Sequence, residues 1–261
     1  MRLFSLRALV LSLAVAVALI PAATAGDKVW PVHEKRFGER SVCYMLPDAG
    51  GPHPVIVALC GRTQSGMAYC TGSILGRLSG QHAFARRALE LGYAVVAPNP
   101  TTPRCEGVYQ WDYTETDPNR SDNLFLKRVI DWIKSGKDFP VRKDRIYVVG
   151  ISSGGFMASR LAQLFADDIA KVVIRSAGNA NDMSIEGRRC IPVWGGPHEV
   201  KRHPPTMLIH GVRDRLVPVR MSDQYEASLK RAGVEVVYIR AAGKGHRWFT
   251  DYDDRIFEFL R

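Results

Sequence analysis

Residues 145–165 read RIYVVGISSGGFMASRLAQLF, and this stretch decides the fold. Residues 145–150 form a β-branched run of strand length, whereas residues 154–165 repeat their large apolar side chains at helical spacing. Between them lies Gly150-Ile151-Ser152-Ser153-Gly154, which has the pattern G-x-S-x-G. A strand, a tight turn flanked by glycines and a helix together predict a sharp turn that exposes the hydroxyl of Ser152.

The same alternation of strands and helices continues on both sides of this stretch. Buried strands are predicted at 55–59, 93–97, 171–176, 206–210 and 234–240, with an edge strand at 40–46. Helices are predicted at 81–91, from 121 onward, at 221–232 and at 252–260. Apolar strands interleaved with helices predict an α/β fold, with a mostly parallel central sheet and helices on both faces.

The first 25 residues have the features of a secretory signal peptide. Arg2 and Arg7 precede a short apolar run at residues 8–20, and Ala23-Thr24-Ala25 is an A-x-A cleavage pattern. A membrane anchor is the alternative, but this run gives roughly 20 Å of helix against a bilayer core of ~30 Å. We therefore expect a secreted or periplasmic protein without a membrane span, whose residues 26–261 form one catalytic domain.

Charge and cysteine content limit the function less sharply. The formal net charge is +10, and removal of two arginines with residues 1–25 leaves +8. Such an excess attracts polyanions or anionic surfaces, although it also serves solubility. The mature region contains five cysteines, so one or two disulfides are expected and at least one thiol is free or paired between chains.

The nucleophile predicted by the G-x-S-x-G pattern is Ser152, with an ordinary tight turn as the alternative interpretation. A serine hydroxyl needs a base to remove its proton. His246 is the predicted base, because it lies in a glycine-rich loop between the strand at 234–240 and the last helix. His210 is the competitor, but it ends a strand, where packing or hydrogen bonding is the expected role.

The acid that orients the histidine is predicted to be Asp214, in the loop after the strand at 206–210. The order Ser152, Asp214, His246 is the order that α/β hydrolases use. An ion pair with the flanking arginines is the alternative role of Asp214, and Asp182 is the alternative acid.

Two backbone amides are expected to stabilise an oxyanion. The amide of Ser153 begins the helix after the nucleophile, where N–H groups point outward. The second donor should come from the loop at residues 60–66, either from Gly61 or from Arg62, and we favour Arg62.

Three motifs resemble those of polyhydroxybutyrate-depolymerase-like and feruloyl-esterase-like α/β hydrolases. They are Gly150-x-Ser152-x-Gly154-Gly155-x-Met157-Ala158, residues 59–65 (family pattern L-H-G-C-T-Q-S) and Gly245-His246-Arg247-Trp248 (family pattern G-H-x-W). Cys60 and Arg62 depart from the family's histidine and cysteine, and Phe249 replaces its Pro-Gly. The resemblance implies the α/β-hydrolase fold and cofactor-free hydrolysis of polyesters, aromatic acid esters or acetylated sugars.

Basic and aromatic residues gather near the three predicted catalytic residues. The predicted substrate-binding residues are Arg62, Trp111, Arg213, Arg247 and Trp248. Arginine binds carboxylates through a planar fork, so we hypothesise a negatively charged substrate. The alternatives are arginines that point outward or pair with acids, and aromatic side chains that cover the core.

Other classes of function have less support. The chain lacks a G-x-x-x-x-G-K-[ST] phosphate loop, a C-x-x-C pair and a recognition element for nucleic acid, so no cofactor, metal or nucleic-acid partner is expected. Two alternatives to an ester hydrolase stay open. One is an amide-cleaving hydrolase of a polyanion such as poly(aspartate), and the other is a non-catalytic binding protein on a hydrolase scaffold.

Overall fold

The computed structural model describes residues 28–72, 79–100, 109–186, 189–193 and 199–261. The predicted signal peptide at residues 1–25 lies outside these ranges. Within them, no helix combines the length and the apolar character that crossing a bilayer requires.

A single eight-stranded sheet forms the centre of the fold, in the order β1-β2-β4-β3-β5-β6-β9-β10. Its strands are β1 (His33–Phe37), β2 (Arg40–Met45), β3 (His53–Leu59), β4 (Ala94–Pro98), β5 (Val141–Ile151), β6 (Lys171–Arg175), β9 (Thr206–Gly211) and β10 (Val236–Ala241). From β4 to β10 all neighbouring strands are parallel, whereas β2 runs antiparallel to both β1 and β4. The predicted mostly parallel sheet is confirmed.

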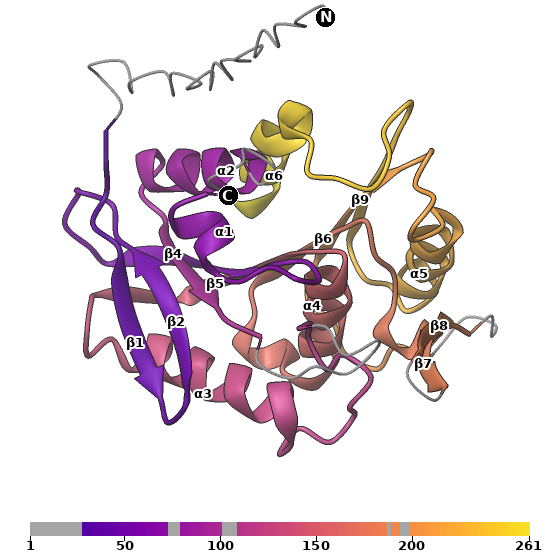
Figure 1. Cartoon of the computed structure of the whole chain (residues 1–261), viewed down its shortest axis with the longest axis horizontal. Coiled ribbons are helices and arrows are strands. Elements are labelled where there is room, and N and C mark those ends of the chain that lie inside the picture. The colour runs from indigo at the N-terminus through magenta and orange to yellow at the C-terminus, as the bar shows by residue number, and fades with distance from the viewer. Residues whose placement is uncertain (1–27, 73–78, 101–108, 187–188, 194–198) are drawn as a thin grey trace, which may run out of the picture.

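Helices cover both faces of this sheet, as the sequence predicts. They are α1 (Met67–Cys70), α2 (Ser79–Glu90), α3 (Ser121–Ser135), α4 (Ser153–Leu164), α5 (Arg220–Arg231) and α6 (Asp253–Leu260). Helices α1, α2 and α6 lie together on one face, and α3, α4 and α5 lie on the other (Figure 1). Short 3₁₀ turns follow α4, precede β7 and precede α6, at Ala166–Asp168, Ala180–Asp182 and Thr250–Tyr252.

The core lies between these layers because the central strands are apolar on both faces. Every residue of β4 is buried, and β3 is buried at all positions except Pro54. Helix α3 turns its apolar side chains toward the sheet and ends at Gly136, whose φ of 65° is a left-handed conformation that glycine adopts without strain.

Two sequence predictions need correction. The strand predicted at residues 40–46 is not the edge, because β1 pairs with its outer side. A two-stranded sheet of β7 (Met183–Glu186) and β8 (Arg189–Pro192) was not predicted. Strand β1 consists mostly of charged residues, and β7 and β8 are only four residues long each, so neither has the extended apolar pattern on which strand prediction depends.

The pairing of the described cysteines agrees with their odd number in the sequence. Cys43 of β2 is bonded to Cys70 of α1, and Cys190 is also in a disulfide. Cys60, directly after β3, is a buried free thiol. The cross-link from β2 to α1 anchors the segment that follows β3 to the sheet, next to the carboxyl ends of the parallel strands, where chemistry gathers in α/β folds.

Candidate active site

Ser152 occupies a strained turn between β5 and α4. Its φ of 56° and ψ of −121° lie outside the usual regions for a residue with a side chain. A Cβ on Gly150 would lie 2.1 Å from the carbonyl oxygen of Gly154, and one on Gly154 would lie 2.2 Å from that of Leu59. Both glycines are therefore required by close backbone approach, and the turn projects the serine side chain out of the sheet.

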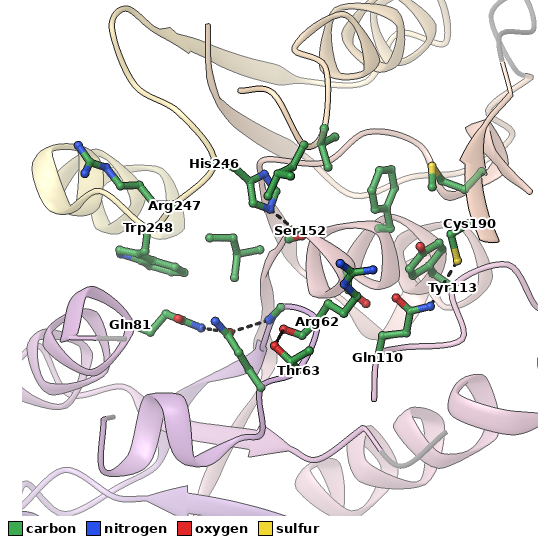
Figure 2. A pocket seen from close by; sticks show the side chains of 18 of the residues that line it. Arg62, Thr63, Gln81, Gln110, Tyr113, Ser152, Cys190, His246, Arg247 and Trp248 are labelled. Atoms are coloured by element: carbon green, nitrogen blue, oxygen red, sulfur yellow. Dashed lines mark hydrogen bonds between the residues drawn. The ribbon is translucent and has the colours of Figure 1, made fainter. Parts of the chain in front are cut away.

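The three side chains predicted from sequence lie within hydrogen-bonding distance of one another. Nε2 of His246 is 2.9 Å from Oγ of Ser152, and Nδ1 of His246 is 2.7 Å from Oδ2 of Asp214. Because an ionised carboxylate only accepts, Nδ1 carries the proton and Nε2 is left to accept the serine hydrogen. The base and nucleophile are thus arranged for proton transfer, as Figure 2 shows for His246 and Ser152.

Asp214 is fixed from several sides. Its Oδ1 accepts hydrogen bonds from the amides of Leu216 and Val217, both at 2.9 Å, and its Oδ2 also lies 3.2 Å from Nε2 of His210. Burial raises the pKa of Asp214, but hydrogen bonds from His210, His246 and Val217 outweigh it and hold the pKa well below its usual range. The carboxylate therefore stays charged and keeps one orientation.

The loop that carries His246 rests on a buried ionic network that the sequence did not predict. Arg175, the last residue of β6, donates to Oδ1 of Asp253 at 2.9 Å and to the carbonyl of Phe249 at 2.5 Å. Its guanidinium stacks 3.9 Å from the Trp248 ring, and the Trp248 indole also donates to Asp253. A charged residue that ends the apolar strand KVVIR was the only sequence signal for this network.

The same arginine also contacts the nucleophile turn. The carbonyl of Arg175 accepts the N–H of Ser152 at 2.9 Å. The backbone of Arg175 thus fixes the turn, while its side chain fixes the loop of the base. Burial raises the pKa of Asp253 to about 6, against the opposing effect of Arg175 and Trp248, so its negative charge depends on these partners.

The loop after β3 lies beside the nucleophile turn, where an oxyanion donor is needed. A Cβ on Gly154 would also meet the Cys60 carbonyl, at 2.5 Å, so this loop and the start of α4 are in backbone contact. The amide of Ser153 begins α4. The amide of Gly61 is occupied, since it donates to Oε1 of Gln64 at 2.9 Å. Of the two predicted second donors, Gly61 therefore already has its N–H engaged within the loop.

A pocket of about 670 Å³ opens over Ser152 and His246. One end holds Tyr113 and Cys190, with Phe156 packed against Tyr113, and the other holds Gln81, Arg247 and Trp248 (Figure 2). Met183 and Gly80 also line the pocket. Figure 2 shows Ser152 between these ends, with Arg62 and Thr63 below it and Gln110 beside Tyr113. Gln81 and Gln110 also line the pocket and were not predicted, since no sequence motif contains them.

Three of the five predicted substrate-binding residues line this pocket: Arg62, Arg247 and Trp248. Trp111 does not, because its side chain is 1% exposed and its indole donates to the carbonyl of Cys60 at 2.9 Å. Trp111 therefore holds the loop after β3. This agrees with the alternative interpretation of the aromatic residues, in which they cover the core. Arg213 is exposed and lies outside the pocket lining.

The fold and this site define an α/β hydrolase. Residues 83–260 match the model of the prolyl oligopeptidase family, and the chain belongs to that family of serine hydrolases. The class expected from the sequence motifs is therefore confirmed.

Similar proteins include several esterases. Over 224 residues the chain is 29% identical to a poly(3-hydroxyoctanoate) depolymerase from Pseudomonas fluorescens, covering 82% of this chain and 76% of that protein. The fold is similar to that of an acetyl xylan esterase from Aspergillus awamori, with a TM-score of 0.67, 15% identity and coverage of 88% and 98%. A ferulic acid esterase has a TM-score of 0.61 at 16% identity, with coverage of 90% and 97%.

The buried pair Arg175–Asp253 generates a prediction about stability. Arg175→Met leaves a buried carboxylate without its cation, and we expect the free energy of unfolding to fall by about 3–5 kcal/mol. The double variant Arg175→Met/Asp253→Asn should lose clearly less than the sum of the two single variants, because it removes both charges.

Urea denaturation of the wild type, the two single variants and the double variant measures these free energies of unfolding. Lys230→Met is the matched control, because Lys230 pairs with Glu226 on the surface of α5 and should cost at most about 1 kcal/mol. Strict additivity of the Arg175 and Asp253 substitutions would show that the two residues do not act as a pair.

Proposed function

We propose that this protein hydrolyses carboxylic esters through an acyl-enzyme formed on Ser152. The observation that carries the proposal is the hydrogen-bonded series Ser152, His246 and Asp214, at the floor of an open pocket. A binding protein on a hydrolase scaffold has no need of all three side chains in this geometry.

The first half of the reaction transfers the acyl group to the enzyme. His246 Nε2 removes the hydroxyl proton of Ser152 while Oγ attacks the ester carbonyl carbon, and the carbonyl oxygen becomes an oxyanion. The intermediate collapses by breaking the carbon–oxygen bond of the ester, and His246 donates the proton to the departing alcohol.

The second half releases the acid. A water molecule gives a proton to His246 and attacks the acyl-enzyme, and collapse returns that proton to Oγ of Ser152. Asp214 keeps Nδ1 protonated throughout and stabilises the imidazolium that forms in each half. The amides of Ser153 and Arg62 are the proposed donors to the oxyanion.

Polyesters, hydroxycinnamate esters and acylated sugars are the proposed substrate classes. The names of the similar proteins favour esters, since they include a poly(3-hydroxyoctanoate) depolymerase, an acetyl xylan esterase and a ferulic acid esterase. Tyr113, Phe156 and Met183 in the pocket lining offer apolar surface for such an acyl group. Amide cleavage is the second candidate, favoured by the prolyl oligopeptidase family match.

A negatively charged substrate is the finer proposal. Arg62 and Arg247 line the pocket, and no aspartate or glutamate is among the described lining residues. Burial raises the pKa of the Tyr113 phenol to about 12, and the charge of Arg62 opposes this shift. A carboxylate of the substrate near Tyr113 would therefore lie close to the guanidinium of Arg62.

Ser152→Ala should abolish ester hydrolysis and labelling by a fluorophosphonate probe. We expect a loss in kcat of about 10⁴-fold or more, because the nucleophile is gone while binding is kept. This loss is measured by comparing hydrolysis by the purified wild type and variant. The substrates are p-nitrophenyl acetate, methyl ferulate, hydroxybutyrate oligomers and poly(aspartate). Poly(aspartate) as the preferred member would favour the amide-cleaving alternative.

Ser153→Ala is the matched control for this experiment. It keeps the proposed amide donor and removes only a hydroxyl that accepts from the Trp111 amide, so it should keep labelling and most of the activity. Equal hydrolysis by wild type and Ser152→Ala would contradict the serine mechanism.

Arg62→Gln should reduce the preference for a carboxylate-bearing ester over its neutral methyl ester by about tenfold. A hydrogen bond to a charged group contributes about 1.5–3 kcal/mol, and 1.4 kcal/mol is a factor of ten. The measurement is the ratio of the two kcat/KM values. Arg213→Gln is the control, since it removes the same charge outside the pocket. An unchanged ratio in Arg62→Gln would rule out this anionic subsite.

Export is proposed from residues 1–25, which precede the described residues. Expression of the full chain in a bacterium with a general secretion pathway should yield a mature protein that begins at Gly26. The intact mass of the protein recovered from periplasm and medium checks this expectation. Full-length protein confined to the cytoplasm would contradict it.

A further inference from the structure

His210 lies behind the proposed catalytic residues, and its hydrogen bonds do not fit a neutral ring. It ends β9 in a fully buried position outside the pocket lining. Its Nδ1 is 2.6 Å from Oγ of Ser222, and its Nε2 is 2.9 Å from the carbonyl of Val217 and 3.2 Å from Oδ2 of Asp214. Each ring nitrogen therefore has a close polar neighbour.

The neighbour of Nδ1 can only accept a hydrogen from it. Oγ of Ser222 lies 2.5 Å from the carbonyl oxygen of Ala177. A carbonyl has no hydrogen to give, so the single serine hydrogen lies between Ser222 and Ala177. The serine oxygen is then left with lone pairs facing Nδ1, and Nδ1 must carry a hydrogen.

The neighbours of Nε2 are acceptors as well. The carbonyl of Val217 cannot donate, and Asp214 is ionised because its Oδ1 accepts two backbone amides and its Oδ2 accepts from His246. Nε2 must therefore carry a hydrogen too. A ring with hydrogens on both nitrogens is an imidazolium cation.

We propose that His210 is held as an imidazolium and acts as a positioning residue for Asp214. Oδ2 of Asp214 lies between two imidazoles, 2.7 Å from His246 and 3.2 Å from His210. The buried carboxylate is thus compensated before the reaction begins. The consequence for catalysis rests on the proposed function. The cation at His210 makes a second positive charge on His246 less favourable, so His246 stays neutral at rest and can accept a proton.

The other charges around His210 already have partners. From α5, Asp223 accepts a hydrogen bond from Tyr238 and pairs with Arg240. From β6, Arg175 is held by Asp253. From the loop that carries His246, Lys244 pairs with Asp251. The contacts of His210 itself are with Ser222, Val217 and Asp214, and among these groups Asp214 alone is charged.

Ser222→Ala tests the charge while keeping the ring. It removes the acceptor at Nδ1 and leaves both acceptors at Nε2, so His210 should become a neutral ring with its hydrogen on Nε2. With the cation lost, the imidazolium form of His246 is more favoured. The acid limb of the kcat/KM profile for a neutral ester should then move to higher pH by about one unit.

Ser228→Ala is the matched control. It removes a buried hydroxyl of the same helix, and this hydroxyl donates to the Gln224 carbonyl. Ser228→Ala should leave the acid limb in place. His210→Gln should move the limb in the same direction as Ser222→Ala. An unmoved limb in Ser222→Ala, with activity retained, would overturn the proposal, because a merely structural hydrogen bond would not shift it.

Nitrogen-15 NMR of the histidine rings provides a test without activity. At pH 8 an ordinary histidine is neutral, since its unperturbed pKa is about 6.5. We expect one ring, assigned to His210 by its absence in His210→Gln or by its change in Ser222→Ala, to show two protonated nitrogens at this pH. A neutral tautomer at His210 would overturn the proposal even if Ser152→Ala confirms the esterase. An imidazolium in a protein without esterase activity would sink the proposed function alone.

Discussion

The close contact between β5 and α4 at Ser152 is the constraint on which the site depends. The carbonyls of Gly154 and Leu59 occupy the space where side chains at Gly150 and Gly154 would lie. At this contact Ser152 has a positive φ, and α4 begins at the residue that follows it. The strain of that conformation is sustained because the strands on both sides of β5 are buried and paired.

Arg175 links this turn to the second half of the site. Its carbonyl holds the amide of Ser152, and its guanidinium holds Phe249, Trp248 and Asp253. The nucleophile and the loop of the base come from distant parts of the chain, so their relative position needs such a connection. A buried cation serves this purpose better than apolar packing, because hydrogen bonds fix direction as well as distance.

The sequence was sufficient for those features that a local pattern encodes. The motif around Ser152, the apolar strands and the loop positions of Asp214 and His246 predicted both the sheet and the residues that meet at its edge. Arg175 and Gln110 could not be found in this way, because their roles arise from contacts between segments far apart in the sequence. Trp111 was predicted to bind substrate but is buried. An aromatic residue in a polar loop is equally compatible with a pocket and with the core, so the sequence alone could not separate the two.

Two carboxylates near the site have opposite environments, and the difference lies in their donors. Asp253 has a pKa of about 6 although Arg175 lies against it, because burial dominates. Asp214 is held far below its usual pKa, because two amides and two imidazoles converge on its oxygens. A carboxylate that must stay charged through a reaction cycle needs this excess of donors. His210 supplies part of that excess from inside the fold, where the substrate cannot displace it.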